Sequence, residues 1–337
     1  MDEYFKKIMR HNGLPTLLLD NNYFEDKDVF TKELFYACKK VARSVDADLV
    51  VFASEQFNGA SSFNPRFVAL SSGVFVFSRT ISLVVSDYLV NKEIPNISPK
   101  RNKDHKAFYD IFSDLDDSYI TRKLDELTES ELYKQTFQQM ASLFVLFLIF
   151  HEAGHIFHRH GARHYGSGLD CDRMSESLVS SENEALDSQA RELISDIFAY
   201  EQLISNQLVK VKEIIENERE RYLAYISQYH IYLAVYFYFL SPKISEKNFT
   251  RSSHPPTAFR FQILLTMLLG NESLGLSRRE KEETIAKFQY GLKDILENVF
   301  SDTAHVEWLF SIPESELKVW FRRVYERIPK WHIDGGL

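Results

Sequence analysis

ASLFVLFLIFHEAGH, residues 141–155, sets the architecture that we expect for this chain. Its first part is apolar almost without interruption, and the residues that follow carry two histidines and a glutamate. The preceding residues, ESELYKQTFQQ at 129–139, also suit a helix, and Gly161 is well placed to end it. Because a helix that is apolar on every face must be buried, we predict one long core helix over about 129–160.

The pentapeptide at 151–155 matches the pattern HExxH, in which two histidines stand four residues apart on a helix. Residues at this spacing share one helix face, so the imidazoles of His151 and His155 can hold one metal ion. Glu152 stands beside them and can take a proton from an attacking water. In a zinc site the metal lowers the pKa of that water and polarises the scissile carbonyl, and the glutamate passes the proton to the leaving amine. The motif therefore predicts hydrolysis of a peptide bond.

A catalytic zinc needs a third protein ligand and an open position for water. A second helix, predicted over about 184–205, supplies the pattern RELISD at 191–196. Glu192 would complete a His2Glu ligand set for one zinc ion (Zn2+) per chain. Asp196 lies on the same helix face, where it can accept a hydrogen bond from the free ring nitrogen of a ligand histidine. Both carboxylates therefore belong to the predicted site.

Two other interpretations of these residues stay open. HExxH also occurs by chance in buried helices, although a glutamate beneath the run LFVLFLIF is costly to bury without a partner such as a metal. The same ligands can also hold a structural zinc, but such sites favour closed, cysteine-rich coordination. Cys38 and Cys171 lie far apart without CxxC spacing, and the intact Glu152 favours a catalytic site.

The other histidines have less specific surroundings. His158, His160 and His164 follow the first motif, and we expect them at the surface or near the helix C-terminus, interacting with its dipole. His230 lies among tyrosines and is expected to be an ordinary core histidine. His254 sits in SSHPPT, a proline-stiffened loop that can aim its side chain, although the same residues also suit a plain helix N-terminus.

The N-terminal part of the sequence alternates helix and strand signals. We predict a helix within 14–45, a strand in ADLVVFASE at 47–55, a turn-rich break in NGASSFNP at 58–65, two strands in RFVALSSGVFVFSR at 66–79, and then a further helix. Exposed connections are predicted near 91–106 and over 164–189. After the second motif apolar residues recur at helical spacing, so the C-terminal half is predicted to be helical.

These elements together predict an α+β fold, mainly helical and zincin-like, with a small N-terminal sheet packed on the active-site helix. We divide the chain into a mixed α/β part at 1–125, a helical catalytic part at 126–270 and a helical C-terminal part at 271–337. A chain of 337 residues is long enough for one such elaborated domain, or for two or three units.

The composition excludes several classes of protein. Hydrophobic residues make up 45% and charged residues 26%, as in ordinary globular proteins rather than disordered or coiled-coil chains. A formal net charge of -8 argues against a nucleic-acid partner. Two cysteines cannot build a disulfide framework, and MDEYFKKIMRHNG at the start lacks the apolar core of a secretory signal. We expect a cytoplasmic protein whose mature chain starts at this methionine.

Two apolar runs, 141–150 and 231–240, are the candidates for membrane spans. Each is shorter than the roughly 20 apolar residues that a span requires, so we expect buried core helices and no integral membrane segment. Tyrosines in the second run leave peripheral membrane contact open, because tyrosine favours membrane interfaces.

In their order along the chain, these motifs resemble those of the gluzincin metallopeptidases, and most closely the family of the CAAX prenyl protease and the heat-shock membrane protease. That family has a strand pair, an HExxH helix, a helix with Glu-x-x-x-Asp, and a His-Pro loop with an arginine six residues after its histidine, here Arg260. The resemblance covers residues 65–265 and implies that His254 and Arg260 act near the zinc.

The resemblance also implies a substrate-binding strand. Phe67, Val68, Ala69 and Leu70 would form an edge strand that pairs with an extended substrate through main-chain hydrogen bonds. Members of that family usually have membrane spans around this core, so their membrane-protein substrates are not transferred to this chain. In general layout the chain is also similar to the phage-exclusion Lit-type peptidases, which cleave translation elongation factor Tu.

The preferred hypothesis is a zinc-dependent endopeptidase that acts on a protein or peptide substrate. Housekeeping, stress-response and phage-defence roles all stay open. The alternative is a non-catalytic, zinc-stabilised regulator that binds a partner through the aromatic-rich helix at 222–240.

Overall fold

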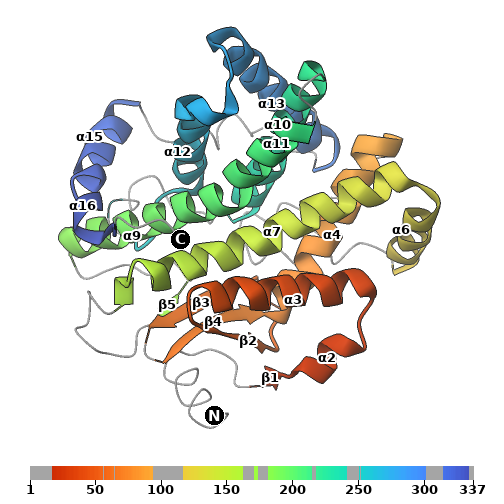
Figure 1. Cartoon of the computed structure of the whole chain (residues 1–337), viewed down its shortest axis with the longest axis horizontal. Helices are drawn as coiled ribbons and strands as arrows, with labels where there is room; N and C mark the ends of the chain where they lie inside the picture. Colours follow the sequence, from red (N-terminus) through yellow and green to blue (C-terminus); the bar gives the residue numbers. More distant parts are fainter. Residues whose placement is uncertain are drawn as a thin grey trace.

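The computed structural model describes residues 17–55, 57–63, 65–93, 117–161, 171–173, 181–214, 218–240, 250, 252–300 and 314–333. Over these residues the chain is mainly helical with a small sheet near the N-terminus, so the predicted α+β class is confirmed. Figure 1 shows the sheet and the other helices arranged around one long central helix, α7, Glu131–Phe157. Most of the exposed connections predicted near 91–106 and over 164–189 lie outside the described residues.

The described sheet has five strands in the order β1-β2-β4-β3-β5. β2 and β4 pair in parallel, and the other neighbours pair antiparallel. α7 contacts both β3 and β4, so the sheet packs on this helix (Figure 1). The strands are β1 Leu18–Leu19, β2 Asp48–Phe52, β3 Gly59–Phe63, β4 Arg66–Ser71 and β5 Cys171–Arg173.

Two sequence predictions in this region are wrong. The predicted break NGASSFNP contains β3, because pairing with β4 on one side and β5 on the other overrides the weak strand propensity of its small and polar residues. The second strand predicted in RFVALSSGVFVFSR is instead the start of a helix, α4, Ser72–Asn91. Ser72 exchanges hydrogen bonds with the backbone of Ser54, just beyond β2, and this fixes the first turn of α4. The buried residues that follow pack on α7.

Helices fill most of the rest of the described chain, as predicted for its C-terminal half. They are α2 Asn21–Glu25, α3 Val29–Ser44, α6 Asp117–Glu129, α9 Glu182–Tyr200, α10 Asn206–Ile214, α11 Arg219–Phe239, α12 Thr257–Gly270, α13 Arg278–Asn298, α15 Glu314–Tyr325 and α16 Ile328–Trp331. A π-helical turn, Glu201–Ser205, joins α9 to α10, and a 3-10 turn, Glu272–Leu274, follows α12.

α7 is the long helix predicted from the apolar run. Ser130 caps its start with a side-chain hydrogen bond to the first turn. The helix ends before Gly161, because Arg159 takes a left-handed conformation with φ of 55° and turns the chain. No residue of 140–157 is exposed, since α3, α4, α9 and α11 all pack on this part of the molecule.

Apolar side chains form two large cores that share α7. One core joins α7 to α4, α11 and α13, and includes Phe144 and Tyr236. The other joins α7 to α3 and the sheet, and includes Phe35 and Leu148. A smaller cluster around Trp320 joins α9 and α12 to α15 and α16. Because both large cores rest on α7, residues at its C-terminal end are held on several sides.

Two helices, α4 and α7, are long and apolar enough to cross a membrane, judged by length and composition alone. However, 72% of the most apolar window of α4 and 78% of that of α7 lie inside the fold, as is usual for core helices. Most of the run at 231–240 belongs to α11; its Tyr232 and Tyr236 are buried and its Tyr238 is half-buried. Tyr232 and Tyr236 therefore add nothing to a membrane-facing or partner-binding surface.

Candidate active site

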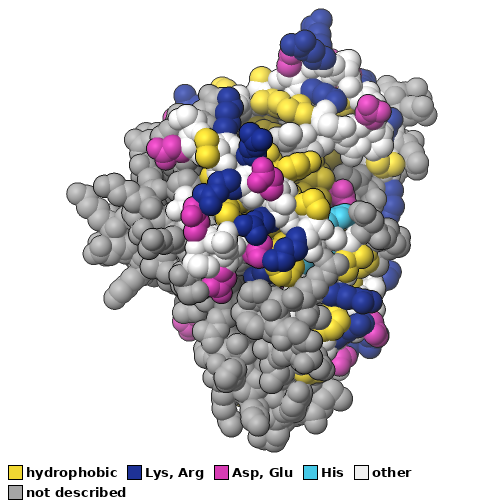
Figure 2. Space-filling model, turned by 90° about the vertical axis from the view of Figure 1, so that its left-hand side faces the viewer, with side chains coloured by type: hydrophobic (Ala, Val, Ile, Leu, Met, Phe, Trp, Pro, Cys, Tyr) yellow, Lys and Arg dark blue, Asp and Glu magenta, His cyan; other side chains and the backbone are white. Residues whose placement is uncertain are grey.

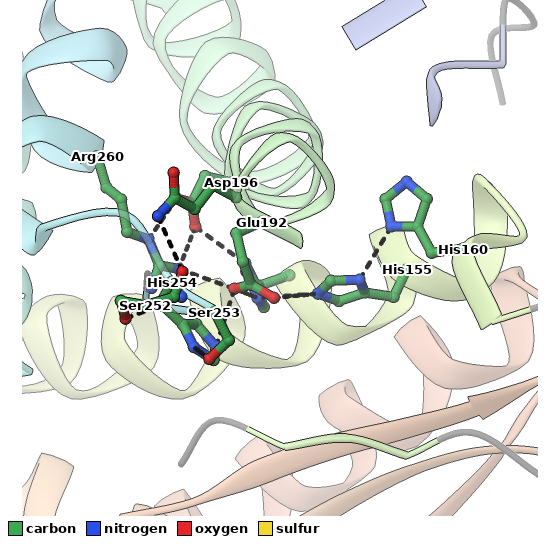
Figure 3. A network of polar contacts seen from close by, with 10 residues as sticks. His155, His160, Glu192, Asp196, Ser252, Ser253, His254 and Arg260 are labelled. Carbon is green, nitrogen blue, oxygen red and sulfur yellow. Dashed lines mark hydrogen bonds and ion pairs between the residues drawn. The ribbon is translucent and has the colours of Figure 1, made fainter. Parts of the chain in front are cut away.

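The structure brings His151, His155 and Glu192 together between α7 and α9. The Nε2 atoms of the two histidines lie 3.2 Å apart, and the Glu192 carboxylate oxygens lie 3.3 Å from His151 Nε2 and 3.4 Å from His155 Nε2. All three side chains are buried. Figure 3 shows His155 and Glu192 facing each other. This group of donor atoms can hold a metal ion.

The spacing of these donor atoms fits a small tetrahedral metal ion. Ligand atoms about 2.0 to 2.1 Å from such an ion lie about 3.3 Å from one another, close to the separations in this group. The Nδ1 atoms of both histidines contact other side chains, so both Nε2 atoms can present lone pairs to the shared space. A metal ion in this space would accept both lone pairs and balance the charge of the buried carboxylate.

Gly154, inside the HExxH motif, lets the two helices approach closely. A Cβ built at this position would lie 3.1 Å from the Ser195 Cα and 3.3 Å from the Phe198 side chain. A larger residue would push α9, and Glu192 with it, away from the histidines. The middle of the motif therefore helps to place the third donor as well as the first two.

His151 is supported by a charged pair. Its Nδ1 lies 2.9 Å from Asp196 Oδ1, and Arg260 of α12 binds the same carboxylate through Nε at 2.6 Å and Nη2 at 2.7 Å. Burial raises the pKa of Asp196, but the charge and hydrogen bonds of Arg260 outweigh it and lower the pKa. Burial lowers the pKa of His151, but its hydrogen bonds to Asp196 and Glu192 outweigh it and raise the pKa to about 10. Arg260 thus contacts Asp196, the hydrogen-bond partner of His151.

His155 is supported by a neutral side chain, His160. The Nδ1 atoms of the two rings lie 2.9 Å apart, and the His160 ring is fully buried (Figure 3). Burial lowers the pKa of His160 well below its usual value, and the nearby charges of His155 and Arg191 lower it further. The two histidines on α7 therefore have partners of different charge.

The sequence placed His158 and His160 at the surface or near the helix C-terminus; His158 is the C-cap of α7, but the surface alternative is wrong for both. Both side chains are buried, because the chain turns at Arg159 and places the two rings against α9 and α16. His164 lies outside the described residues. The turn that brings His160 toward His155 is centred on Arg159 and not on a glycine, so the sequence does not mark it. The signal that could have pointed to His160 is the high density of histidines after the apolar run.

Glu152 lies beside β3. The residue is buried, and a Cβ built on Gly59 would lie 3.0 Å from Glu152 Oε1, so a larger residue in β3 would crowd the carboxylate. Its Oε2 has no hydrogen-bond partner among the described residues. Burial raises the pKa of Glu152 to about 7, although the charges of His151 and His155 lower it. A carboxyl group that titrates near neutral pH suits a general base.

His254, in the loop before α12, also reaches the site. Its Nε2 lies 3.3 Å from Glu192 Oε2, and its Nδ1 lies 2.9 Å from the Ser253 hydroxyl (Figure 3). Gln189 of α9 donates a hydrogen bond of 2.9 Å to the Ser252 carbonyl, which ties the loop to α9. α12 begins directly after the two prolines, so this loop is a helix N-terminus that also aims His254.

The predicted substrate strand is wrong. Phe67, Val68, Ala69 and Leu70 lie in β4, which pairs with β2 on one side and with β3 on the other. The four side chains are buried, and neither edge of the strand is open to another chain. The sequence pattern of 67–70 predicts a strand but does not show which strands pair with it. In the described sheet the edge strands are β1 and β5.

His230 is a core histidine, as predicted. Its Nε2 lies 3.0 Å from the Tyr200 hydroxyl, and its Nδ1 lies 2.7 Å from the Ile226 carbonyl. Burial lowers its pKa to about 4. This histidine is therefore held neutral by core partners and does not join the group of His151, His155 and Glu192.

Comparison with known proteins agrees with a peptidase site. The family model described as peptidase U49 matches residues 69–275, which make up more than half of the chain and include α7 and α9. No curated protein and no solved structure matches the chain significantly. The chain therefore belongs to the peptidase U49 family.

Proposed function

We propose that this peptidase is a zinc-dependent endopeptidase of the gluzincin kind, in which His151, His155 and Glu192 hold one zinc ion and Glu152 is the general base. The observation that carries the proposal is the set of donor separations of 3.2, 3.3 and 3.4 Å beside a buried glutamate. Membership of a peptidase family supports a protein or peptide substrate.

Zinc suits this donor set better than other common metal ions. Two imidazoles and one carboxylate are a frequent ligand set of catalytic zinc sites, which keep a fourth position open. Calcium and magnesium prefer oxygen ligands, and both histidines offer nitrogen. When bound, zinc would lower the pKa of a coordinated water and polarise the scissile carbonyl.

Glu152 carries the proton transfer in this proposal. Its pKa of about 7 allows it to accept a proton at neutral pH and to release the proton again. It would take a proton from the attacking water and donate it to the leaving amine, so the peptide bond breaks and one water is consumed. Ser61 of β3, which hydrogen-bonds Glu152, would hold the carboxylate in place during both transfers.

His254 and Arg260 have different roles in this proposal. With its Nδ1 held by the Ser253 hydroxyl, His254 would use Nε2, which faces Glu192, to donate a hydrogen bond to a substrate oxygen that gains charge during the reaction. Arg260 binds Asp196 and lies 3.8 Å from Glu192 Oε2, so it would act through His151 and Glu192 and not on the substrate. The order of HExxH, ExxxD, His-Pro loop and arginine supports the gluzincin assignment. The buried free thiol of Cys38 is compatible with the cytoplasmic location that we propose.

The first test compares wild type with Glu152→Gln. Elemental analysis measures zinc per chain, and mass spectrometry identifies new N-termini in a cell-lysate proteome. We expect about one zinc in both proteins and new termini only with wild type, because the substitution removes the base and keeps the ligands. Glu131→Gln, at an exposed position of the same helix, is the matched control and should behave as wild type. A wild-type protein without zinc would overturn the proposal.

Zinc without cleavage would favour the alternative function, a non-catalytic, zinc-stabilised regulator that binds a partner. Most aromatic side chains of α11 are buried, which leaves the half-buried Tyr225 and Tyr238 on the surface first suggested for such a partner. Purified elongation factor Tu, suggested by the Lit-type resemblance, is the first single substrate to add to the assay.

A further inference from the structure

A segment outside the family match contacts the surroundings of the metal site. We define the C-terminal segment as residues 314–333, which contain α15 and α16 and pack on α9. Its Trp331 is 1% exposed and lies edge-on to His160, with ring centres 6.2 Å apart. The Arg191 guanidinium of α9 lies 4.7 Å from the centre of the Trp331 ring. Trp331 therefore links α9 to His160.

The same segment also contacts the neighbour of His160. The rings of His158 and His160 stack with their centres 5.6 Å apart and 17° between their planes. The Ile333 backbone N–H donates a hydrogen bond of 3.1 Å to His158 Nδ1. The C-terminal segment thus holds His160 directly through Trp331 and indirectly through His158.

His160 in turn determines the state of His155. Because His155 directs Nε2 toward His151 and Glu192, its Nδ1 must carry the ring proton if Nε2 is to offer a lone pair. His160 Nδ1, at 2.9 Å, is the atom placed to accept the hydrogen bond from His155 Nδ1–H. The pair thereby fixes both the tautomer and the ring plane of His155.

A second connection runs from the C-terminal segment to the loop that carries His254, which also contacts Glu192. Trp320 Nε1 of α15 donates a hydrogen bond of 2.8 Å to Gln189 Oε1, and Gln189 Nε2 donates one of 2.9 Å to the Ser252 carbonyl. These bonds join α15 through α9 to the loop that carries His254. The C-terminal segment therefore contacts both His160, the partner of His155, and Gln189, which holds the loop of His254.

Ion pairs hold the outer face of the C-terminal segment on α9. Arg323 pairs with Glu182, and both Arg327 and Lys330 pair with Asp187. Figure 2 shows the side of the molecule on which α15 and α16 lie, where Lys and Arg side chains stand among Asp and Glu. Partly exposed pairs of this kind contribute little stability each, so the buried aromatic contacts dominate the attachment.

We infer that His160 is a positioning residue for His155, and that the C-terminal segment belongs to the metal centre because it holds His160 in place. The inference rests on the proposed metal site and extends it to residues beyond the HExxH and ExxxD motifs. Its consequence is that changes in α16, which supplies no ligand, should weaken metal binding.

The test measures the zinc affinity of the full-length, metal-stripped protein by competition with a chromophoric chelator, together with its thermal unfolding. His160→Leu removes the acceptor and should weaken zinc binding by about 10- to 100-fold. His160→Asn places an oxygen acceptor near the position of Nδ1 and should recover most of that loss. A merely structural role would lower the unfolding temperature of both variants alike and would give no recovery with asparagine.

Trp331→Leu tests the inference from the other side of the contact and keeps it testable if His160→Leu does not fold. It should weaken zinc binding several-fold and alter the absorption spectrum of the cobalt-substituted protein. Tyr325→Ala, an exposed aromatic of the same segment, should change neither. If wild type binds zinc and every variant binds it equally well, the inference is wrong and the proposed function stands. If wild type binds no zinc, both are wrong.

Discussion

The two histidines that α7 contributes to the site are supported in opposite ways. His151 contacts an anion, Asp196, whose charge is balanced by Arg260, whereas His155 contacts a neutral imidazole, His160. The two side chains that support His151 lie on α9 and α12. His160, which supports His155, is held by Trp331 of the C-terminal segment. One task, the orientation of a histidine ring, is thus done by charge in one case and by packing in the other.

Breaking the charged support should have the largest effect. Asp196→Asn removes the two short hydrogen bonds of the buried Arg260 guanidinium and leaves it only the Glu192 carboxylate, at 3.8 Å, so we expect the free energy of unfolding to fall by about 3 to 5 kcal/mol. Urea unfolding of the metal-free protein measures this loss. The double variant Asp196→Asn, Arg260→Met removes the unpaired charge and should recover most of the stability. A single variant as stable as wild type would contradict this view of the pair.

His230 is a second histidine with uncharged partners, because it contacts the Tyr200 hydroxyl and the Ile226 carbonyl. Its pKa is about 4 in the folded state and 6.5 for an unperturbed histidine. The unfolded state therefore takes up a proton first, so stability is complete above pH 6.5 and falls by up to about 3 kcal/mol as the pH drops toward 4. Urea unfolding across this pH range measures the slope. The slope should flatten in His230→Gln, and an unchanged slope would show that other groups cause it.

The smallest effect is expected where the C-terminal segment reaches the His254 loop. Gln189→Leu removes two buried hydrogen bonds, to Trp320 and to Ser252, and should lower the free energy of unfolding by about 1 to 3 kcal/mol. Arg323→Ala, which breaks only a partly exposed ion pair of the same segment, is the control and should lose less than about 1 kcal/mol. Urea unfolding compares the two variants. Equal losses of unfolding free energy would mean that the Gln189 hydrogen bonds stabilise the protein no more than a partly exposed ion pair does.

The parts of the site that could be predicted from the sequence are those fixed by helical spacing. The relation of His151 to His155, and that of Glu192 to Asp196, needs only a helix, and the structure has helices at both places. Such relations are local, so they follow from the order of residues alone. The chemical roles of these residues remain the predictions that the zinc and cleavage measurements test.

The parts that could not be predicted depend on contacts between distant segments. β3 consists of residues whose local preference is a turn, and only its two neighbouring strands make it a strand. β4 lies in the middle of the sheet for the same kind of reason. His160 contacts His155 because Arg159 takes a left-handed conformation, which the sequence does not indicate because the residue is not a glycine. Trp331, near the end of the described chain, contacts His160.

The burial of α7 also limits how this protein can diverge in evolution. Every residue of 140–157 is buried or half-buried, and this stretch both joins two cores and carries His151, Glu152 and His155. A substitution on any face of this stretch disturbs either the packing or the site, so residues 140–157 offer no face on which mutations can accumulate freely. New substrate preferences must then arise in the exposed first turns of α7 and in the strands, loops and terminal helices around it, while residues 140–157 stay nearly unchanged.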